Sequence, residues 1–232
     1  MVKLGKTNKE AKLLKEFIST PKGVYKITKK EIDILDAFCK NPIKNVDFKG
    51  LKFVIGGKSN RALFNALKKL ANLNVLVTKR LGRTISYSIN FQNPLAITML
   101  SFIEGLNSRN KKNLNYRLID SILEEIESPY LSLVITGSYV EEKETKNSDL
   151  DVVAIIPDCE DKRVMNNYLK NKGQLSTPEI HPYVFSVSEF YKMLINKEEN
   201  YGKEIYRKRI VIYGAEAFYK IAKRAIENGF QG

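Results

Sequence analysis

Residues 134–156, VITGSYVEEKETKNSDLDVVAII, contain two apolar runs that a charged segment separates. The first run, LSLVIT from residue 131, has the composition of a buried strand and ends at Gly137-Ser138. The second run follows Asp149 and Asp151, and we expect its strand to begin at Ser148. Glycine permits a sharp exit from a strand. The stretch therefore predicts a strand, a tight turn, a polar loop and a second strand with two carboxylates at its head.

These two aspartates and the Gly137-Ser138 pair together predict a site for a phosphate and a metal ion. Residues i and i+2 of a strand project from one face, about 6.6 Å apart. Two such carboxylates repel each other unless a cation joins them, and hard oxygen ligands suit Mg²⁺. Glycine lets backbone amides approach a phosphate closely, and the serine adds a hydroxyl donor. The alternative interpretation of Asp149 and Asp151 is a solvated start of a strand.

The spacing between Gly137-Ser138 and Asp149-Leu150-Asp151 resembles that of the nucleotidyltransferase superfamily related to DNA polymerase β, in its minimal nucleotidyltransferase branch. The similarity extends over about residues 112–220. It implies a mixed sheet with helices on one side, and transfer of a nucleoside monophosphate from an NTP, which we expect to be ATP, with loss of pyrophosphate. It also implies that Gly137 and Ser138 bind the nucleotide's triphosphate, while Asp149 and Asp151 are catalytic and bind one or two Mg²⁺ ions.

The resemblance further implies a third catalytic and metal-binding carboxylate on a neighbouring strand. The matching segment is residues 178–186, PEIHPYVFS, with a helix expected at residues 187–194. Glu179 takes this third position. His181, the sole histidine, would project from the same face, either to assist the reaction or only to form a hydrogen bond.

Two departures from the family pattern leave the activity open. Relatives carry Gly-Ser-Phe/Tyr-Ala-Arg-Gly-Glu, whereas this chain has Glu141 and Glu142 where the arginine and the second glycine stand. Three interpretations follow: an enzyme that modifies a protein or a small molecule, a transcription regulator whose silent domain senses a nucleotide, and the antitoxin of a toxin–antitoxin pair. Arg207 and Arg209 would either neutralise phosphates or form a surface run of charge.

The net charge of +13 is confined to the first part of the chain. Residues 1–93 contain 20 Lys and Arg against 6 Asp and Glu, while the remainder contains 19 against 20. A positive field concentrated in one region favours a polyanionic partner, here double-stranded DNA. The alternative interpretation is a lysine-rich composition that favours solubility.

The same region has the element order of a winged helix. Thr28 and Glu31 form a predicted capping box before a helix, and a short segment then leads to the turn Gly56-Gly57 and to Lys58. Ser59 is the expected N-cap of a helix that has Leu63, Phe64, Leu67 and Leu70 on its apolar face, and a hairpin over residues 75–90 follows. The run resembles the winged-helix transcription regulators, in which the third helix enters the major groove. The predicted DNA contacts are Ser59, Asn60, Arg61, Asn65, Lys68, Lys69, Arg80 and Arg83.

We therefore predict an α+β chain with a DNA-binding winged-helix domain at 1–93, a connecting helix and linker at 94–111, and a nucleotidyltransferase-like domain at 112–232. The winged helix could alternatively serve protein interaction, and the apolar helix expected after Asn93-Pro94 would allow a homodimer. No apolar run is long enough for a membrane span, and the basic residues 1–17 lack the apolar core of a signal peptide. Cys39 and Cys159 are not spaced as zinc ligands, and a cytoplasmic location is expected.

Overall fold

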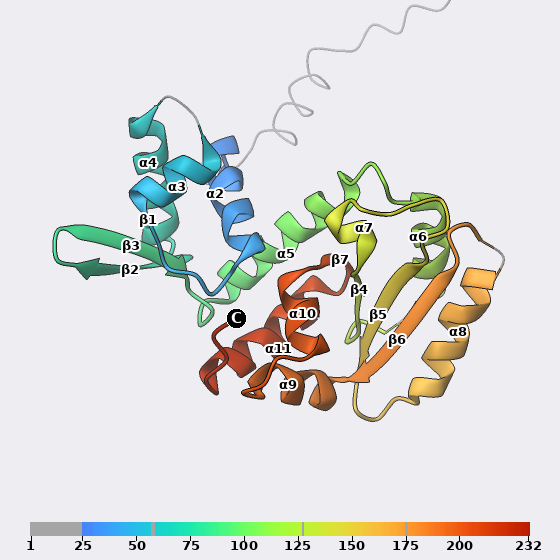
Figure 1. Ribbon diagram of the computed structural model, residues 1–232. Coiled ribbons are helices and arrows are strands. Elements are labelled where there is room, and N and C mark those ends of the chain that lie inside the picture. The colour runs from blue at the N-terminus through green and yellow to red at the C-terminus, as the bar shows by residue number, and fades with distance from the viewer. Residues whose placement is uncertain (1–24, 57–58, 127, 175) are drawn as a thin grey trace, which may run out of the picture.

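The computed structural model describes residues 25–56, 59–126, 128–174 and 176–232, and it has the mixed α+β composition that the sequence predicts (Figure 1). A three-stranded sheet lies in the N-terminal part and a four-stranded sheet in the C-terminal part. The predictions for Gly57, for Lys58 and for residues 1–17 lie outside the described residues. In the part of the chain that is described, no helix is long and apolar enough to cross a membrane.

Among residues 25–56 and 59–93, three helices and a hairpin follow one another in the expected order. The elements of this N-terminal part are α2 (Lys29–Lys40), β1 (Val46–Asp47), α3 (Phe48–Ile55), α4 (Asn60–Asn72), β2 (Leu76–Leu81) and β3 (Thr84–Ile89). The hairpin strands are antiparallel, and β1 adds to β3, so the strand order is β1-β3-β2. The assignment of this part as a DNA-binding winged helix stays a prediction.

The predicted helix caps are confirmed. The Thr28 hydroxyl accepts a hydrogen bond from the Glu31 amide, and the Glu31 carboxylate accepts one from the Thr28 amide at 2.8 Å. The Ser59 hydroxyl accepts a hydrogen bond from the Ala62 amide at 3.2 Å at the start of α4. Each side chain binds a backbone donor that the first helical turn leaves without an intrahelical partner.

The predicted apolar face of α4 is wrong at one position. Leu63, Leu67 and Leu70 are buried as expected, but Phe64 is 52% exposed and Ala66 is buried in its place. Positions 63, 66, 67 and 70 follow the i, i+3, i+4, i+7 stripe of a helix, and residue 64 lies off that stripe.

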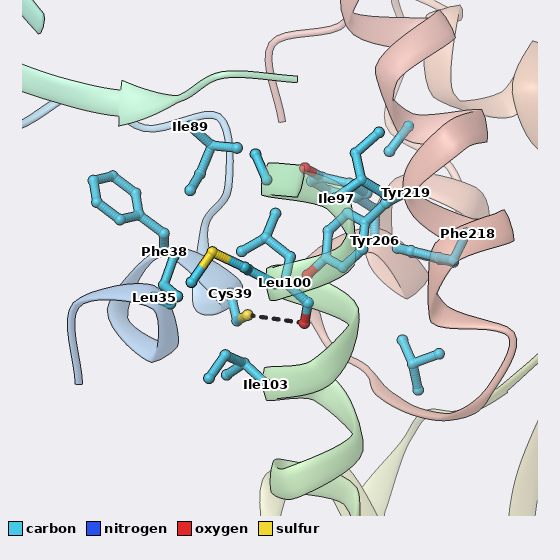
Figure 2. Close-up of a cluster of buried hydrophobic side chains, with 14 of the residues drawn as sticks. Leu35, Phe38, Cys39, Ile89, Ile97, Leu100, Ile103, Tyr206, Phe218 and Tyr219 are labelled. Carbon is cyan, nitrogen blue, oxygen red and sulfur yellow. Dashed lines mark hydrogen bonds between the residues drawn. The ribbon is translucent and has the colours of Figure 1, made fainter. Parts of the chain in front are cut away.

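Helix α5 (Pro94–Arg109) contributes to one core that both parts of the chain share. Asn93 caps its start, as the sequence predicts. It packs against α2 on one side and against β7 (Ile210–Tyr213) and α11 (Ala215–Glu227) on the other. Figure 2 shows this core, to which the three helices contribute Leu35, Phe38, Leu100, Ile103, Phe218 and Tyr219. The predicted division at residues 93 and 111 stays a prediction.

The four-stranded sheet of the C-terminal part is mixed, as expected. Its other strands are β4 (Ser132–Ile135), β5 (Leu150–Ile156) and β6 (Ile180–Ser186), and the order is β6-β5-β4-β7. Strands β5 and β6 run parallel, whereas β4 is antiparallel to both β5 and β7. The heads of β5 and β6 therefore lie at the same edge of the sheet.

Helices cover both faces of this sheet, and the expectation of helices on one side is wrong. One face carries α6 (Tyr116–Leu123) and α8 (Lys162–Gln174). The other carries α5 and α11 together with α9 (Val187–Ile195) and α10 (Tyr201–Arg207). Six of the seven β5 residues are buried. Because alternate strand residues point to opposite faces, a strand buried in this way needs cover on both.

The segment between β4 and β5 differs from the predicted open loop. Residues Ser138–Glu141 form a short helix, α7, directly after Gly137. Strand β5 begins at Leu150 rather than Ser148, because the Ser148 hydroxyl accepts a hydrogen bond from the Thr145 amide at 2.9 Å and so closes a turn before the strand. Asp149 therefore lies just before the strand.

Candidate functional site

Gly137 packs directly against the side chain of Asp151. The Thr136 amide, at the end of β4, donates a hydrogen bond to the Asp151 carbonyl oxygen at 3.1 Å. Gly137 then turns the chain with φ 72° and ψ −147°. A Cβ atom at residue 137 would lie 2.2 Å from Asp151 Oδ2. Both the backbone conformation and the carboxylate therefore require glycine at this position.

Ser138 begins α7 at the same edge of the sheet. The amide of Val140 donates to the Gly137 carbonyl oxygen at 3.1 Å, and the amide of Lys143 donates to that of Ser138 at 3.0 Å. The turn thus brings the Gly137-Ser138 pair, predicted to bind phosphate, to the predicted metal-binding carboxylates. The roles of these residues in binding phosphate and metal stay predictions.

Asp149 and Asp151 lie at the head of β5, Asp149 exposed and Asp151 with a side chain that is 26% exposed. Burial raises the pKa of the Asp151 carboxyl above its usual value; His181 opposes this effect, and the charge of Asp149 adds to it. His181 Nδ1 lies 3.5 Å from Asp151 Oδ1. A carboxylate that is partly desolvated beside a second carboxylate gains most from a nearby cation.

Glu179 lies beside this pair, just before β6. Its carbonyl oxygen accepts a hydrogen bond from the Leu150 amide at 2.8 Å. The parallel register pairs Leu150 with Ile180 and Asp151 with His181, so His181 projects from the same face as Asp151. A cavity of about 390 Å³ is lined by Asp149, Lys170, Gln174, Glu179, Ile180, His181 and Pro182.

The donor chemistry of Asp149 and Asp151 fits Mg²⁺, which prefers carboxylate oxygens and often binds through one or two of them. Because residue 137 has no side chain, the Asp151 carboxylate lies directly against the backbone of Gly137. No three His, Cys, Asp or Glu side chains among the residues that the structure describes are grouped as ligands of one ion. The role of Glu179 as a third ligand stays a prediction.

A row of aromatic rings adjoins the site, and sequence reasoning missed it. The rings of His181 and Tyr183 are 4.7 Å apart, and Tyr201, from α10, lies 4.9 Å from Tyr183. Burial raises the pKa of Tyr201, and the charges of Tyr183 and Asp151 raise it further. The alternation of His181 and Tyr183 along β6 was the available signal, since both belong to the face that carries Asp151.

The two acids that depart from the family pattern are both bound by lysines. Glu141 forms ion pairs with Lys143 at 3.3 Å and with Lys208. Glu142, which adopts a left-handed conformation at φ 56°, pairs with Lys111 at 2.7 Å. These ion pairs lower the pKa of both carboxyls. The acids thus attach the end of α7 to two distant segments of the chain, a role that the sequence alone did not reveal.

Arg207 and Arg209 have separate roles, and the interpretation as a surface run of charge fits only Arg207. Arg207 pairs with Glu199 at the surface. The side chain of Arg209 is only 3% exposed and pairs with Glu104 of α5 at 2.9 Å. Arg209 is therefore a buried structural cation, and the prediction of a surface run is wrong for it.

The predicted DNA contacts occupy one N-terminal helix and the tip of the hairpin, and all eight are exposed residues. Lys69 is engaged within the molecule, because its ammonium group pairs at 2.8 Å with the fully buried Glu31 of α2. The alternative to its predicted role is that Lys69 attaches α4 to α2 instead of contacting DNA. The remaining predicted contacts are Ser59, Asn60, Arg61, Asn65, Lys68, Arg80 and Arg83.

Comparison with protein families agrees with the geometry of the C-terminal part. Residues 117–225 match the family model of the nucleotidyltransferase domain. The match includes Gly137, Ser138, Asp149, Asp151 and Glu179. The C-terminal part is therefore similar to a nucleotidyltransferase domain. No curated protein and no solved structure matches the chain.

Proposed function

We propose that the protein is a Mg²⁺-dependent nucleotidyltransferase that transfers a nucleoside monophosphate, expected to come from ATP, to a hydroxyl group of a protein or a small molecule. The observation that carries the proposal is the contact between Gly137 and the Asp151 carboxylate inside the matched domain. It places a turn suited to phosphate next to a carboxylate suited to a metal ion.

The reaction would be an in-line displacement at the α-phosphorus of the NTP. A bond forms between the acceptor oxygen and the α-phosphorus, and the bond to the bridging oxygen breaks, so that pyrophosphate leaves. Backbone amides around Gly137 and the Ser138 hydroxyl would bind the triphosphate. Glu179, beside the cavity at the head of β6, would accept the proton that the acceptor hydroxyl loses.

Asp149 and Asp151 would hold Mg²⁺ in this proposal. When bound, the ion neutralises charge on the phosphate oxygens and fixes their orientation. Burial raises the pKa of the Asp151 carboxyl, and the charge of Asp149 adds to this effect, so a cation at this position would stabilise both carboxylates. The close approach of Gly137 to Asp151 supports the proposal that one nucleotide contacts both parts of the site.

We further propose that the N-terminal part binds double-stranded DNA, with the N-terminus of α4 directed at the major groove. The excess of 20 basic over 6 acidic residues in 1–93 and the exposure of Arg61, Lys68, Arg80 and Arg83 support this. Arg61→Ala and Lys68→Ala should each weaken binding to a mixed-sequence duplex. A variant that loses a phosphate contact should also lower the salt dependence by about one counterion. Binding of the wild type that is insensitive to salt would contradict the proposal.

A second candidate function is a nucleotide sensor that regulates transcription without turnover. The observation that favours it is that no third carboxylate joins Asp149 and Asp151 as a ligand group within the described residues. A sensor would bind NTP with Mg²⁺ and release no pyrophosphate.

Label transfer from NTPs distinguishes the two functions. Each of the four NTPs, labelled at the α-phosphorus, is incubated with the purified protein, Mg²⁺ and cell lysate. An enzyme should attach label to an acceptor, and Asp149→Asn/Asp151→Asn should abolish the transfer. Nucleotide binding without transfer from any NTP would leave only the sensor. No nucleotide binding at all would overturn both.

A further inference from the structure

Lys208 contacts both ends of the proposed triphosphate-binding segment. Its ammonium group pairs with Glu141, the last residue of α7. Its carbonyl oxygen accepts a hydrogen bond from the Thr136 hydroxyl at 3.1 Å, directly before Gly137. The position of residue 208 and the conformation of residues 136–141 are therefore linked.

The next residue, Arg209, contacts the N-terminal part of the molecule. Its guanidinium group donates to the Cys39 carbonyl oxygen at 3.0 Å, to Glu104 at 2.9 Å and to the Tyr219 hydroxyl at 3.0 Å. Cys39 belongs to the last turn of α2, and Figure 2 shows it packed against α5. The guanidinium also donates to the Tyr206 carbonyl oxygen. A buried guanidinium with these four partners strongly constrains α2 relative to β7.

A third contact continues this path from α2 to α4. Glu31 of α2 is fully buried and pairs with Lys69 of α4 at 2.8 Å. The two helices also pack against each other in the shared core. A displacement of α4 on a nucleic acid would therefore be transmitted to α2, and from α2 to Arg209.

A cavity of about 550 Å³ adjoins this path. Its lining includes Cys39, Glu141, Lys208 and Arg209, together with Lys111. Close-packed interiors resist small displacements, whereas side chains beside a polar cavity have room to rearrange. The cavity lies where the nucleotide segment and α2 would have to move relative to each other.

We propose that Lys208 and Arg209 form a joint, meaning the pair of residues that couples the two binding sites energetically, so that nucleotide binding changes the affinity for DNA and DNA binding changes the affinity for nucleotide. The inference rests on the proposed function, because it requires both ligands. Lys208 is a positioning residue for the triphosphate segment, and Arg209 connects that segment to α2. Because linkage is reciprocal, DNA must change the affinity for nucleotide by the same factor as nucleotide changes the affinity for DNA.

The test measures MgATP binding to the full-length chain with and without a mixed-sequence DNA duplex. The wild type should show a change in the Kd of about 5-fold or more. Lys208→Met should bring this factor to about one, with a weaker MgATP affinity in the absence of DNA because Lys208 positions the triphosphate segment. Lys143→Met is the matched control, because Lys143 also pairs with Glu141 but, unlike Lys208, is not adjacent to Arg209, and it should retain the coupling.

Hydrogen exchange adds a measurement that needs no ligand. Glu141→Gln should speed amide exchange in the last turn of α2, whereas Glu142→Gln, which releases only Lys111, should not. Unchanged exchange in Glu141→Gln would overturn the joint. A coupling factor of one in a wild type that binds both ligands would overturn the joint alone. Absence of MgATP or DNA binding in separate titrations would overturn the proposed function and this inference with it.

Discussion

Substitution of Gly137 by alanine probes the contact that defines the site. The new Cβ would lie 2.2 Å from Asp151 Oδ2, a separation that real Cβ contacts do not show, so the carboxylate or the turn must move. The backbone, at φ 72° and ψ −147°, is close to a region that only glycine occupies readily. Such strain costs about 1–3 kcal/mol. Gly137→Ala should therefore lower the free energy of unfolding by that amount in urea denaturation.

Nucleotide binding should suffer in the same variant, because Asp151 cannot keep its position beside residue 137. We expect MgATP affinity to fall at least tenfold, the equivalent of about 1.4 kcal/mol. Gly82→Ala is the matched control: it has a positive φ of 60° but no atom within 4 Å of the new Cβ. Gly82→Ala should lose stability and keep nucleotide affinity. If Gly137→Ala keeps the same nucleotide affinity as Gly82→Ala, the reasoning fails.

Three further predictions concern charge. Burial raises the folded-state pKa of Asp151, so ionisation of this carboxyl destabilises the fold as the pH rises. Asp151→Asn should therefore be more stable than wild type at neutral pH, and this advantage should vanish below a pH of about 3.9, where the carboxyl is protonated in both states. Equal pH–stability curves would contradict this. In chemical denaturation, Glu104→Gln should lower the free energy of unfolding by about 3–5 kcal/mol, because Arg209 stays buried without its carboxylate partner. The double variant Glu104→Gln/Arg209→Met should lose less stability than the sum of the two single variants. Losses that simply add would count against an ion pair. Lys69→Met should lower the free energy of unfolding by about 1–3 kcal/mol, because the buried Glu31 loses a charged donor. Lys68→Met should instead weaken DNA binding at unchanged stability. The reverse pattern would contradict the roles given to the two lysines.

Local sequence chemistry predicted much of the fold. The capping box at Thr28, the N-cap at Ser59 and the helix start at Asn93 each depend on hydrogen bonds within four residues, so their signals are complete in the sequence. The mixed sheet was implied by the family resemblance, and the turn at Gly137 followed by a strand with two carboxylates at its head was predicted from the residues themselves. Phe64 was misplaced because its position on the helix is one residue away from the buried stripe.

Contacts between residues far apart in the chain could not be predicted from the sequence. The partner of Arg209 lies 105 residues away, and that of Lys208 lies 67 residues away. A basic run such as Arg207-Lys208-Arg209 has the same composition whether its members face solvent or the core. Three-dimensional packing places Arg209 in the interior and pairs Lys208 with Glu141 of α7. Helices on both faces of the sheet likewise became evident only from the burial of β5.

Parallel incubations with ATP labelled at the α-phosphorus and at the γ-phosphorus test the central claim most directly. With purified protein, Mg²⁺ and cell lysate, a nucleotidyltransferase should attach the α label to an acceptor, leave the γ label in pyrophosphate, and lose the transfer in Asp149→Asn/Asp151→Asn. Attachment of the γ label, or transfer that persists in the double variant, would contradict the assignment of chemistry to Gly137, Ser138, Asp149 and Asp151.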